Sequence, residues 1–143
     1  MLYYINGKFI LSNEAKIPFS DGGFLYGDGL FETMRFDNRK IFCVFNHLKR
    51  LVKGLKIINL DIKYNKSELI SLLEKVIEKN NLNSGIIRLM ITRGNSDTKL
   101  HHLNVPSVYI SIKPFYELPS SPIKVIYLDE GQYPIIRFTP AIK

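Results

Sequence analysis

One arginine interrupts an apolar stretch of this sequence of 143 residues. Residues 86–92 form a nearly continuous apolar run, which predicts a strand buried on both faces, and Arg88 lies in its middle. A buried guanidinium needs a partner, because an unpaired buried charge costs on the order of several kcal/mol. That partner can be a substrate carboxylate, an internal carboxylate, or water at an edge position, and the residues alone leave all three open.

A second arginine, Arg50, belongs to an expected helix that Asn46 caps and that runs to about Ile58. A helix N-terminus favours anions, and a guanidinium can bind phosphate through two parallel hydrogen bonds. A solvated basic helix face is the simpler structural alternative. The sequence therefore offers Arg50 as a candidate phosphate ligand.

Residues 26–35 begin with closely spaced glycines that lead directly into an expected strand. The stretch has neither a GxGxxG pattern nor a Walker lysine, so it predicts no phosphate-binding loop of those types. Glu32 and Arg35 lie three residues apart, and on a strand they point to opposite faces. Read alone, the stretch indicates a turn followed by a strand.

We expect no metal site. The single cysteine, Cys43, excludes a multi-cysteine zinc site and an intramolecular disulfide, and His101 and His102 are neighbours that cannot both face one metal from a strand. Cys43 lies between Phe42 and Val44 and is expected to be a buried thiol. A reducing, cytoplasmic setting fits this cysteine usage best.

The elements that would position these residues predict an α+β domain with an antiparallel sheet and two helices. The second helix is expected after a capping box formed by Asn65 and Glu68, and it fades at Asn80. Strands are expected in a hairpin over residues 3–10 and at residues 30–36, 40–45, 86–92, 108–113 and 123–128. We expect a small domain over residues 1–118, a linker at 119–122, and the start of a second, larger domain at 123–143.

Composition and charge narrow the possible partners. The chain is 45% apolar and 23% charged, which excludes disorder and coiled coil. No apolar run approaches the roughly 18 residues of a membrane span, and the first residues do not form a secretory signal. The net charge is +7, but the lysines are spread along the chain. We therefore expect neither a nucleic-acid nor a membrane partner.

Taken together, these segments resemble the class IV aminotransferase family, the fold-type IV pyridoxal-phosphate enzymes. This family includes branched-chain aminotransferases, D-amino-acid aminotransferases and aminodeoxychorismate lyases. The resemblance covers essentially the whole chain and rests on residues 26–35, on His47-Leu48-Lys49-Arg50-Leu51, on Ile87-Arg88-Leu89, on Thr92-Arg93-Gly94 and on Lys143.

The resemblance implies a role for each matching residue. Pyridoxal 5'-phosphate is the implied cofactor, with Arg50 on its phosphate and Lys143 as the Schiff-base lysine and acid–base catalyst. Arg88 would meet the side-chain carboxylate of glutamate, and Phe31 would line the substrate pocket. The family also implies a homodimer, for which Phe24-Leu25-Tyr26 is a candidate contact. Family chains continue well beyond this lysine, so we expect either a truncated chain or a separate chain that completes the site.

Details of the motifs separate the possible reactions. D-amino-acid aminotransferases carry an arginine and a histidine shortly after Thr-Arg-Gly, whereas residues 95–100 contain no arginine. This favours transamination between a branched-chain-like L-amino acid and a 2-oxo acid such as 2-oxoglutarate. Gly27-Asp28-Gly29 also suits an aminodeoxychorismate lyase that releases pyruvate. A non-catalytic basic interaction domain derived from such an enzyme is the alternative from another class.

Overall fold

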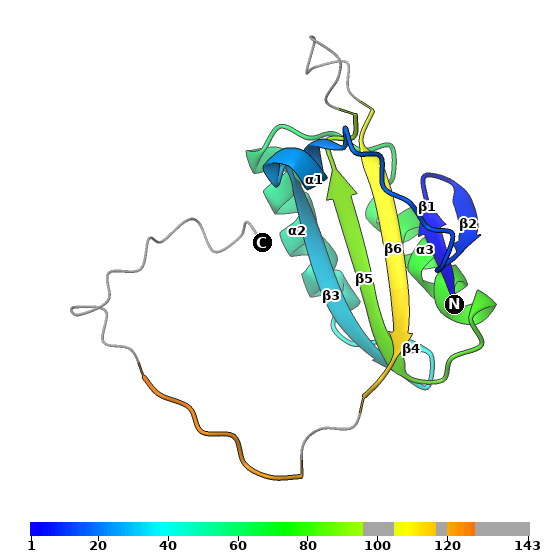
Figure 1. Cartoon of the computed structure of the whole chain (residues 1–143), viewed down its shortest axis with the longest axis vertical. Coiled ribbons are helices and arrows are strands. Elements are labelled where there is room, and N and C mark those ends of the chain that lie inside the picture. The colour runs from blue at the N-terminus through cyan, green and yellow to red at the C-terminus, as the bar shows by residue number, and fades with distance from the viewer. Residues whose placement is uncertain (96–104, 117–119, 128–143) are drawn as a thin grey trace.

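The computed structural model describes residues 1–95, 105–116 and 120–127, and it confirms the expected α+β architecture (Figure 1). Six strands form one antiparallel sheet in the order β2-β1-β6-β5-β3-β4. The strands are β1 (Leu2–Ile5), β2 (Lys8–Leu11), β3 (Gly29–Asp37), β4 (Lys40–Ile41), β5 (Gly85–Thr92) and β6 (Ser107–Pro114). The helices are α1 (Gly22–Tyr26), α2 (Val44–Ile57) and α3 (Lys66–Lys79).

The expected hairpin at the start of the chain is formed by β1 and β2. Its turn residues Asn6 and Gly7 have φ angles of 46° and 97°, as the tight turn between two twisted strands requires. The Asn6 side chain also joins this turn to β6, because its Oδ1 accepts a hydrogen bond from the Val108 backbone at 2.7 Å. The hairpin pairs with β6 through β1, and without it β6 would be an edge strand of the sheet.

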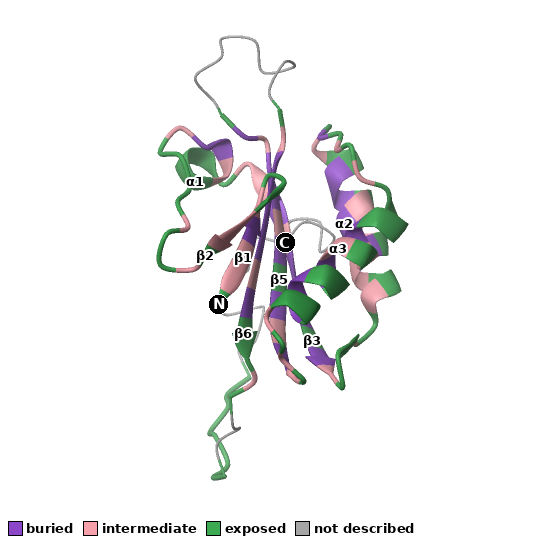
Figure 2. Ribbon diagram, turned by 90° about the vertical axis from the view of Figure 1, so that its right-hand side faces the viewer, coloured by how far each residue is buried: buried purple, intermediate pink, exposed green. Residues whose placement is uncertain are grey.

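Helices α2 and α3 cover one face of the sheet, and α1 lies on the other side (Figure 2). Their leucines recur at helical spacing and meet the inward residues of the strands. The predicted capping box of α3 is confirmed, since the Asn65 and Glu68 side chains each accept the other's backbone N–H. The core between the layers includes Phe36, Leu48, Leu73, Ile87 and Ile110.

Five local expectations were wrong. The strand expected to run to residue 45 ends at Ile41, because α2 begins two residues before Asn46. The N-cap is Cys43, which adopts a φ of 49° and is exposed instead of buried. Residues 123–127 are exposed and form no strand.

Strand β5 is the fifth correction, because it is open on one face. Its residues alternate between buried and more exposed positions, and Arg88 is exposed. The two long helices cover only the other face, so the apolar run does not mark a strand buried on both sides. Among the described residues, no helix is long and apolar enough to cross a membrane.

Candidate functional site

Strand β3 sends successive side chains to two different faces of the sheet. Phe31 and Thr33 lie on the open face, whereas Glu32 is buried toward the helices. The register places Phe31 beside Met90 and Met90 beside Tyr109 in one row across three strands. The next row is formed by Thr33, Arg88 and Ser111. These two rows form the floor of the candidate substrate site.

On the open face, the structure brings Arg88 and Phe31 together. The guanidinium carbon of Arg88 lies 4.8 Å from the centroid of the Phe31 ring, and Nε donates to Thr33 Oγ1 at 3.0 Å. Within the described part of the chain, Arg88 forms no ion pair. Among the described residues, no carboxylate forms the internal salt bridge that was one alternative for Arg88. The guanidinium instead contacts the Phe31 ring and the Thr33 hydroxyl.

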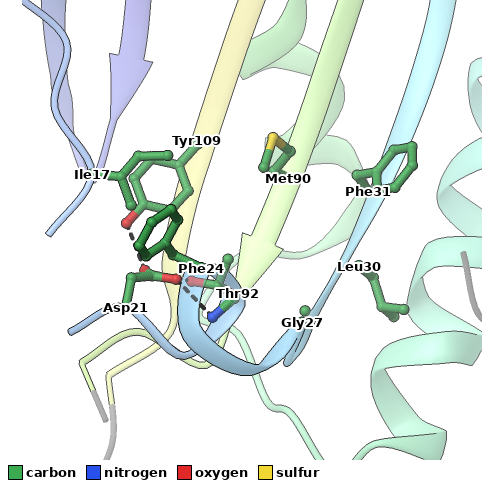
Figure 3. Close-up of a pocket in the computed structure, with 11 residues that line it drawn as sticks. Ile17, Asp21, Phe24, Gly27, Leu30, Phe31, Met90, Thr92 and Tyr109 are labelled. Carbon is green, nitrogen blue, oxygen red and sulfur yellow. Dashed lines mark hydrogen bonds between the residues drawn. The ribbon is translucent and has the colours of Figure 1, made fainter. Parts of the chain in front are cut away.

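Phe31 also lines an apolar cavity of about 420 Å³ (Figure 3). The cavity lies between the open face of the sheet and the segment that contains α1. Its walls are mainly apolar, so it fits an uncharged side chain better than a charged one. The side chains that line it include Ile17, Phe24, Phe31, Met90 and Tyr109.

Asp21 holds one end of this cavity in place. Its buried carboxylate accepts hydrogen bonds from the Gly23 backbone at 2.8 Å, from Thr92 Oγ1 at 2.8 Å and from the Tyr109 hydroxyl at 2.7 Å (Figure 3). Burial, together with the neighbouring Asp21 carboxylate, raises the pKa of Tyr109 to about 12. The hydroxyl therefore stays protonated and keeps donating to Asp21 at neutral pH.

Sequence reasoning did not identify this role of Asp21. The available signal was an N-cap residue followed by two glycines, which starts α1. Gly23 is needed for the close approach, because a Cβ there would lie 2.3 Å from Thr92 Cγ2. One donor to Asp21, the Gly23 backbone, lies in the local turn. The other two, Thr92 and Tyr109, lie 71 and 88 residues after Asp21 in the sequence, so only the fold reveals them.

On the helix-covered face, Arg50 is bound to Glu32. Arg50 Nε donates to Glu32 Oε1 at 2.7 Å, Nη2 donates to Oε2, and His47 Nδ1 lies 2.7 Å from Oε2. Burial alone would raise the pKa of Glu32, but the hydrogen bonds from Arg50 and His47 outweigh it and hold the pKa below its ordinary value. Glu32 is therefore an ionised carboxylate that fixes the guanidinium.

This arrangement changes what Arg50 can offer to a phosphate. The two nitrogens that would form a bidentate contact are already used on Glu32, whereas Nη1 forms no hydrogen bond with the described residues. Arg50 also lies in the second turn of α2 instead of at its start, so the helix terminus does not assist it. The side chain is 41% exposed, which leaves its free N–H groups accessible to one phosphate oxygen.

Comparison with known proteins decides the family. Residues 29–143 match the family model for amino-transferase class IV. The chain belongs to the class IV aminotransferase family. D-alanine aminotransferase of Staphylococcus aureus (strain MSSA476) is 35% identical over 105 residues, which are 73% of this chain and 37% of that protein. A putative branched-chain-amino-acid aminotransferase of Methanocaldococcus jannaschii is 33% identical over 146 residues, which cover 100% of this chain and 51% of that protein.

A solved structure of a class IV relative supports the same fold. The branched-chain amino acid aminotransferase of T.th., complexed with N-(5'-phosphopyridoxyl)-L-glutamate, is 26% identical with a TM-score of 0.70. The likeness covers 80% of this chain and 40% of that chain. The chain thus spans about half, or less, of the length of these relatives.

Two motifs of this class IV aminotransferase chain are joined by a single arginine. Arg93 of the Thr-Arg-Gly motif donates to both oxygens of Asp28, at 2.6 and 3.1 Å. It also donates to the backbone carbonyls of Ile58 and Asn59, just beyond the end of α2. Arg93 therefore fixes the turn before β3 against α2, and its role is structural. Lys143 lies outside the described residues, so its position relative to Arg50 and Arg88 is not part of this geometry.

Proposed function

We propose that this chain forms part of a pyridoxal-phosphate-dependent aminotransferase. The enzyme transfers an amino group between a branched-chain-like L-amino acid and a 2-oxo acid such as 2-oxoglutarate. The observation that carries this proposal is the Phe31–Arg88 pair, which places an apolar wall beside a cation that has no carboxylate partner among the described residues. Such a pair can contact the apolar side chain of one substrate and the acidic side chain of the other.

The apolar cavity supports the first half of the exchange, because Phe31 and Met90 offer the wall that a branched side chain needs. Arg88 supports the second half, because the side-chain carboxylate of glutamate would supply its missing anion. The T.th. relative was solved with a phosphopyridoxyl adduct of L-glutamate, which agrees with glutamate as one partner.

Two residues of this chain would bind the cofactor. Arg50 would donate from its free N–H groups to the phosphate, and its fixed, exposed guanidinium fits that role. Lys143 would hold the other end of the cofactor and move the proton at the reacting carbon of the substrate. When bound, pyridoxal phosphate supplies the electron sink for this chemistry.

Transamination of D-amino acids is the second candidate. It is favoured by the 35% identity to D-alanine aminotransferase of Staphylococcus aureus. The absence of an arginine in residues 95–100 counts against it. The two candidates require the same cofactor residues and differ only in how the substrate is held.

We also propose a homodimer. The side chains of Ile17, Phe19, Phe24 and Tyr26 form an exposed apolar surface around α1, with the Phe19 and Phe24 rings 5.6 Å apart. An exposed apolar surface of this kind is typical of protein interfaces. Phe24, Leu25 and Tyr26 are all exposed in this chain, so they do not form a buried core segment.

The experiment that tests the function compares amino donors in the full-length protein loaded with pyridoxal phosphate. We expect glutamate to form from 2-oxoglutarate with L-leucine or L-norvaline, and not with D-alanine. Arg88→Leu should slow the half-reaction with L-glutamate by roughly 10- to 150-fold, the value of one charged hydrogen bond, and affect L-leucine less. Equal losses with both amino acids contradict the role of Arg88. Activity with D-alanine supports the second candidate, and pyruvate release from aminodeoxychorismate supports a lyase.

A further inference from the structure

A second cavity lies beside the Phe31–Arg88 pair on the open face of the sheet. It has a volume of about 370 Å³ and is lined by Tyr3, Thr33, Ile86, Arg88, Ser111, Ile112, Lys113 and Tyr116. We propose that Lys113 and Arg88 together form a binding subsite for an acidic side chain, in which Lys113 determines the preference for dianionic over monoanionic substrates. This inference rests on the proposed aminotransferase function and adds a residue to it.

The strand register brings the two cations together. Arg88 of β5 lies opposite Ser111 of β6, and Lys113 lies two residues further along β6. Residues two apart on a strand share a face, so Lys113 is the diagonal neighbour of Arg88. Diagonal residues on neighbouring strands are typically about 7–8 Å apart. Both side chains line the same cavity, which confirms that they share this face.

The charges of this cavity are all of one sign. Its lining contains two cations and four hydroxyl-bearing side chains, but no carboxylate. Neither Arg88 nor Lys113 forms an ion pair with another described residue. Lys113 instead lies over the Tyr116 ring, with Nζ 5.6 Å from its centroid. Two neighbouring cations repel each other, and a carboxylate between them would remove that repulsion and gain two charged hydrogen bonds.

A third cation on this face, Arg35, lies outside the cavity. The guanidinium of Arg35 lies 4.3 Å from the centroid of Phe115 and 5.7 Å from that of Phe42, and Arg35 does not line the cavity. Arg88 and Lys113 also contact aromatic rings, so the cavity lining is what distinguishes them from Arg35. The subsite therefore consists of Arg88 and Lys113.

The two cavities would also separate apolar substrate side chains from acidic ones. Phe31 lines the apolar cavity and Arg88 lines the cationic one, and the two residues are stacked on each other. An apolar side chain would occupy the first cavity without reaching Lys113, whereas an acidic one would reach between Arg88 and Lys113. Removal of the Lys113 charge should therefore change one class of ligand only.

The test compares two ligands of equal chain length in the full-length holoenzyme. Glutarate has two carboxylates and valerate has one. In Lys113→Met, we expect the dissociation constant of glutarate, measured by calorimetry, to rise about tenfold, which corresponds to the lower value for one charged hydrogen bond. The affinity for valerate should not change, and Lys113→Arg should retain most of the glutarate affinity. Lys53→Met is the matched control, because it removes an exposed lysine from α2 on the other side of the sheet.

The possible results separate the subsite from the proposed function. Glutarate binding that equals the wild type in Lys113→Met, equal losses for glutarate and valerate, or no binding of glutarate by the wild type would each overturn the subsite. If glutarate binding depends on Lys113 but the protein does not transaminate glutamate, the subsite stands and the proposed function fails. If transamination proceeds and Lys113→Met leaves glutarate binding intact, the function stands and the subsite fails.

Discussion

Arg50 and Arg88 lie on opposite faces of the same sheet, and each is attached to one of two consecutive residues of β3. Arg50 is bound to Glu32 on the side of the helices, and Arg88 is stacked on Phe31 on the open side. Among the described residues, β4 pairs with β3 only at Phe36 and Asp37. The edge of β3 near Phe31 and Glu32 is therefore not paired with β4. The proposed phosphate and substrate contacts are therefore made from two sides of one strand.

Because no described contact joins these arginines, their effects should be additive. We expect Arg50→Ala to weaken cofactor binding about tenfold, and Arg88→Leu to weaken glutamate binding by a similar factor. In the double variant, the loss of cofactor affinity should equal that of Arg50→Ala and the loss of glutamate affinity should equal that of Arg88→Leu, each within about 0.5 kcal/mol. Cofactor titration of the apoprotein and glutamate titration of the holoenzyme measure the two terms. A coupling energy well above that value contradicts the separation.

Arg50→Lys should affect stability as well as cofactor binding. A lysine cannot reproduce the two parallel hydrogen bonds to Glu32, so a buried carboxylate loses part of its compensation. We expect the free energy of unfolding to fall by about 1 kcal/mol, a modest value because the Arg50 side chain is partly exposed to water. Urea unfolding measures this change. Lys49→Ala, at the neighbouring exposed position of α2, serves as the control and should change stability by less than about 0.5 kcal/mol. Wild-type stability in Arg50→Lys would mean that the ion pair contributes nothing.

Stability should also depend on pH through Glu32. Its pKa is lower in the folded protein than in the unfolded chain, so the folded state favours the ionised form. The contribution of Glu32 is therefore complete above the unfolded pKa and is lost as the pH falls through the folded pKa. Urea unfolding between neutral and acidic pH should show a decline that is shallower in Glu32→Gln, which cannot ionise. Identical pH dependence in both proteins would argue against this assignment.

Lys143 provides a direct test of the cofactor assignment. In full-length protein, Lys143→Ala should lose the covalent attachment of pyridoxal phosphate, because no other residue is assigned to hold that end of the cofactor. Visible absorbance before and after borohydride treatment measures the attachment. Lys124→Ala, at an exposed lysine, provides the control and should behave like the wild type. A reducible absorbance band that persists in Lys143→Ala would rule out this lysine.

The exposed apolar surface at α1 should be part of the dimer contact. Replacement of Phe24 by a charged residue, Phe24→Glu, places a carboxylate in an apolar contact and should shift the protein toward a monomer. Light scattering of the full-length protein at micromolar concentration measures the mass. Tyr127→Glu, at another exposed aromatic residue, controls for the added charge. A wild-type monomer would contradict the proposed assembly.

The local elements of the fold could be predicted because their signals are local. The Asn6-Gly7 turn and the Asn65–Glu68 capping box are short motifs with one physical solution each. The N-cap of α2 at Cys43 could not be predicted, because its φ of 49° is unusual for a cysteine and has no sequence signal. The open face of β5 was also hidden, because an apolar run does not reveal which face the helices will cover.

The candidate site was only partly predictable for a related reason. The resemblance to the family identified Phe31 and Arg88, and the structure brings these two residues together. Asp21 and Glu32 were missed as organising residues, because their partners lie far away in sequence. A carboxylate that orients an arginine or holds a cavity wall depends on register and packing. Those relationships are properties of the folded sheet.

The alternation of β3 limits how this part of the protein can change during evolution. A one-residue insertion or deletion in Gly27-Asp28-Gly29 that slipped β3 by one position would exchange its two faces. Phe31 would then turn into the helical layer, and the Glu32 carboxylate would turn toward the open face. A change in the length of this short segment would therefore remove both halves of the site in a single event. We therefore expect homologous chains to keep the same number of residues in this segment.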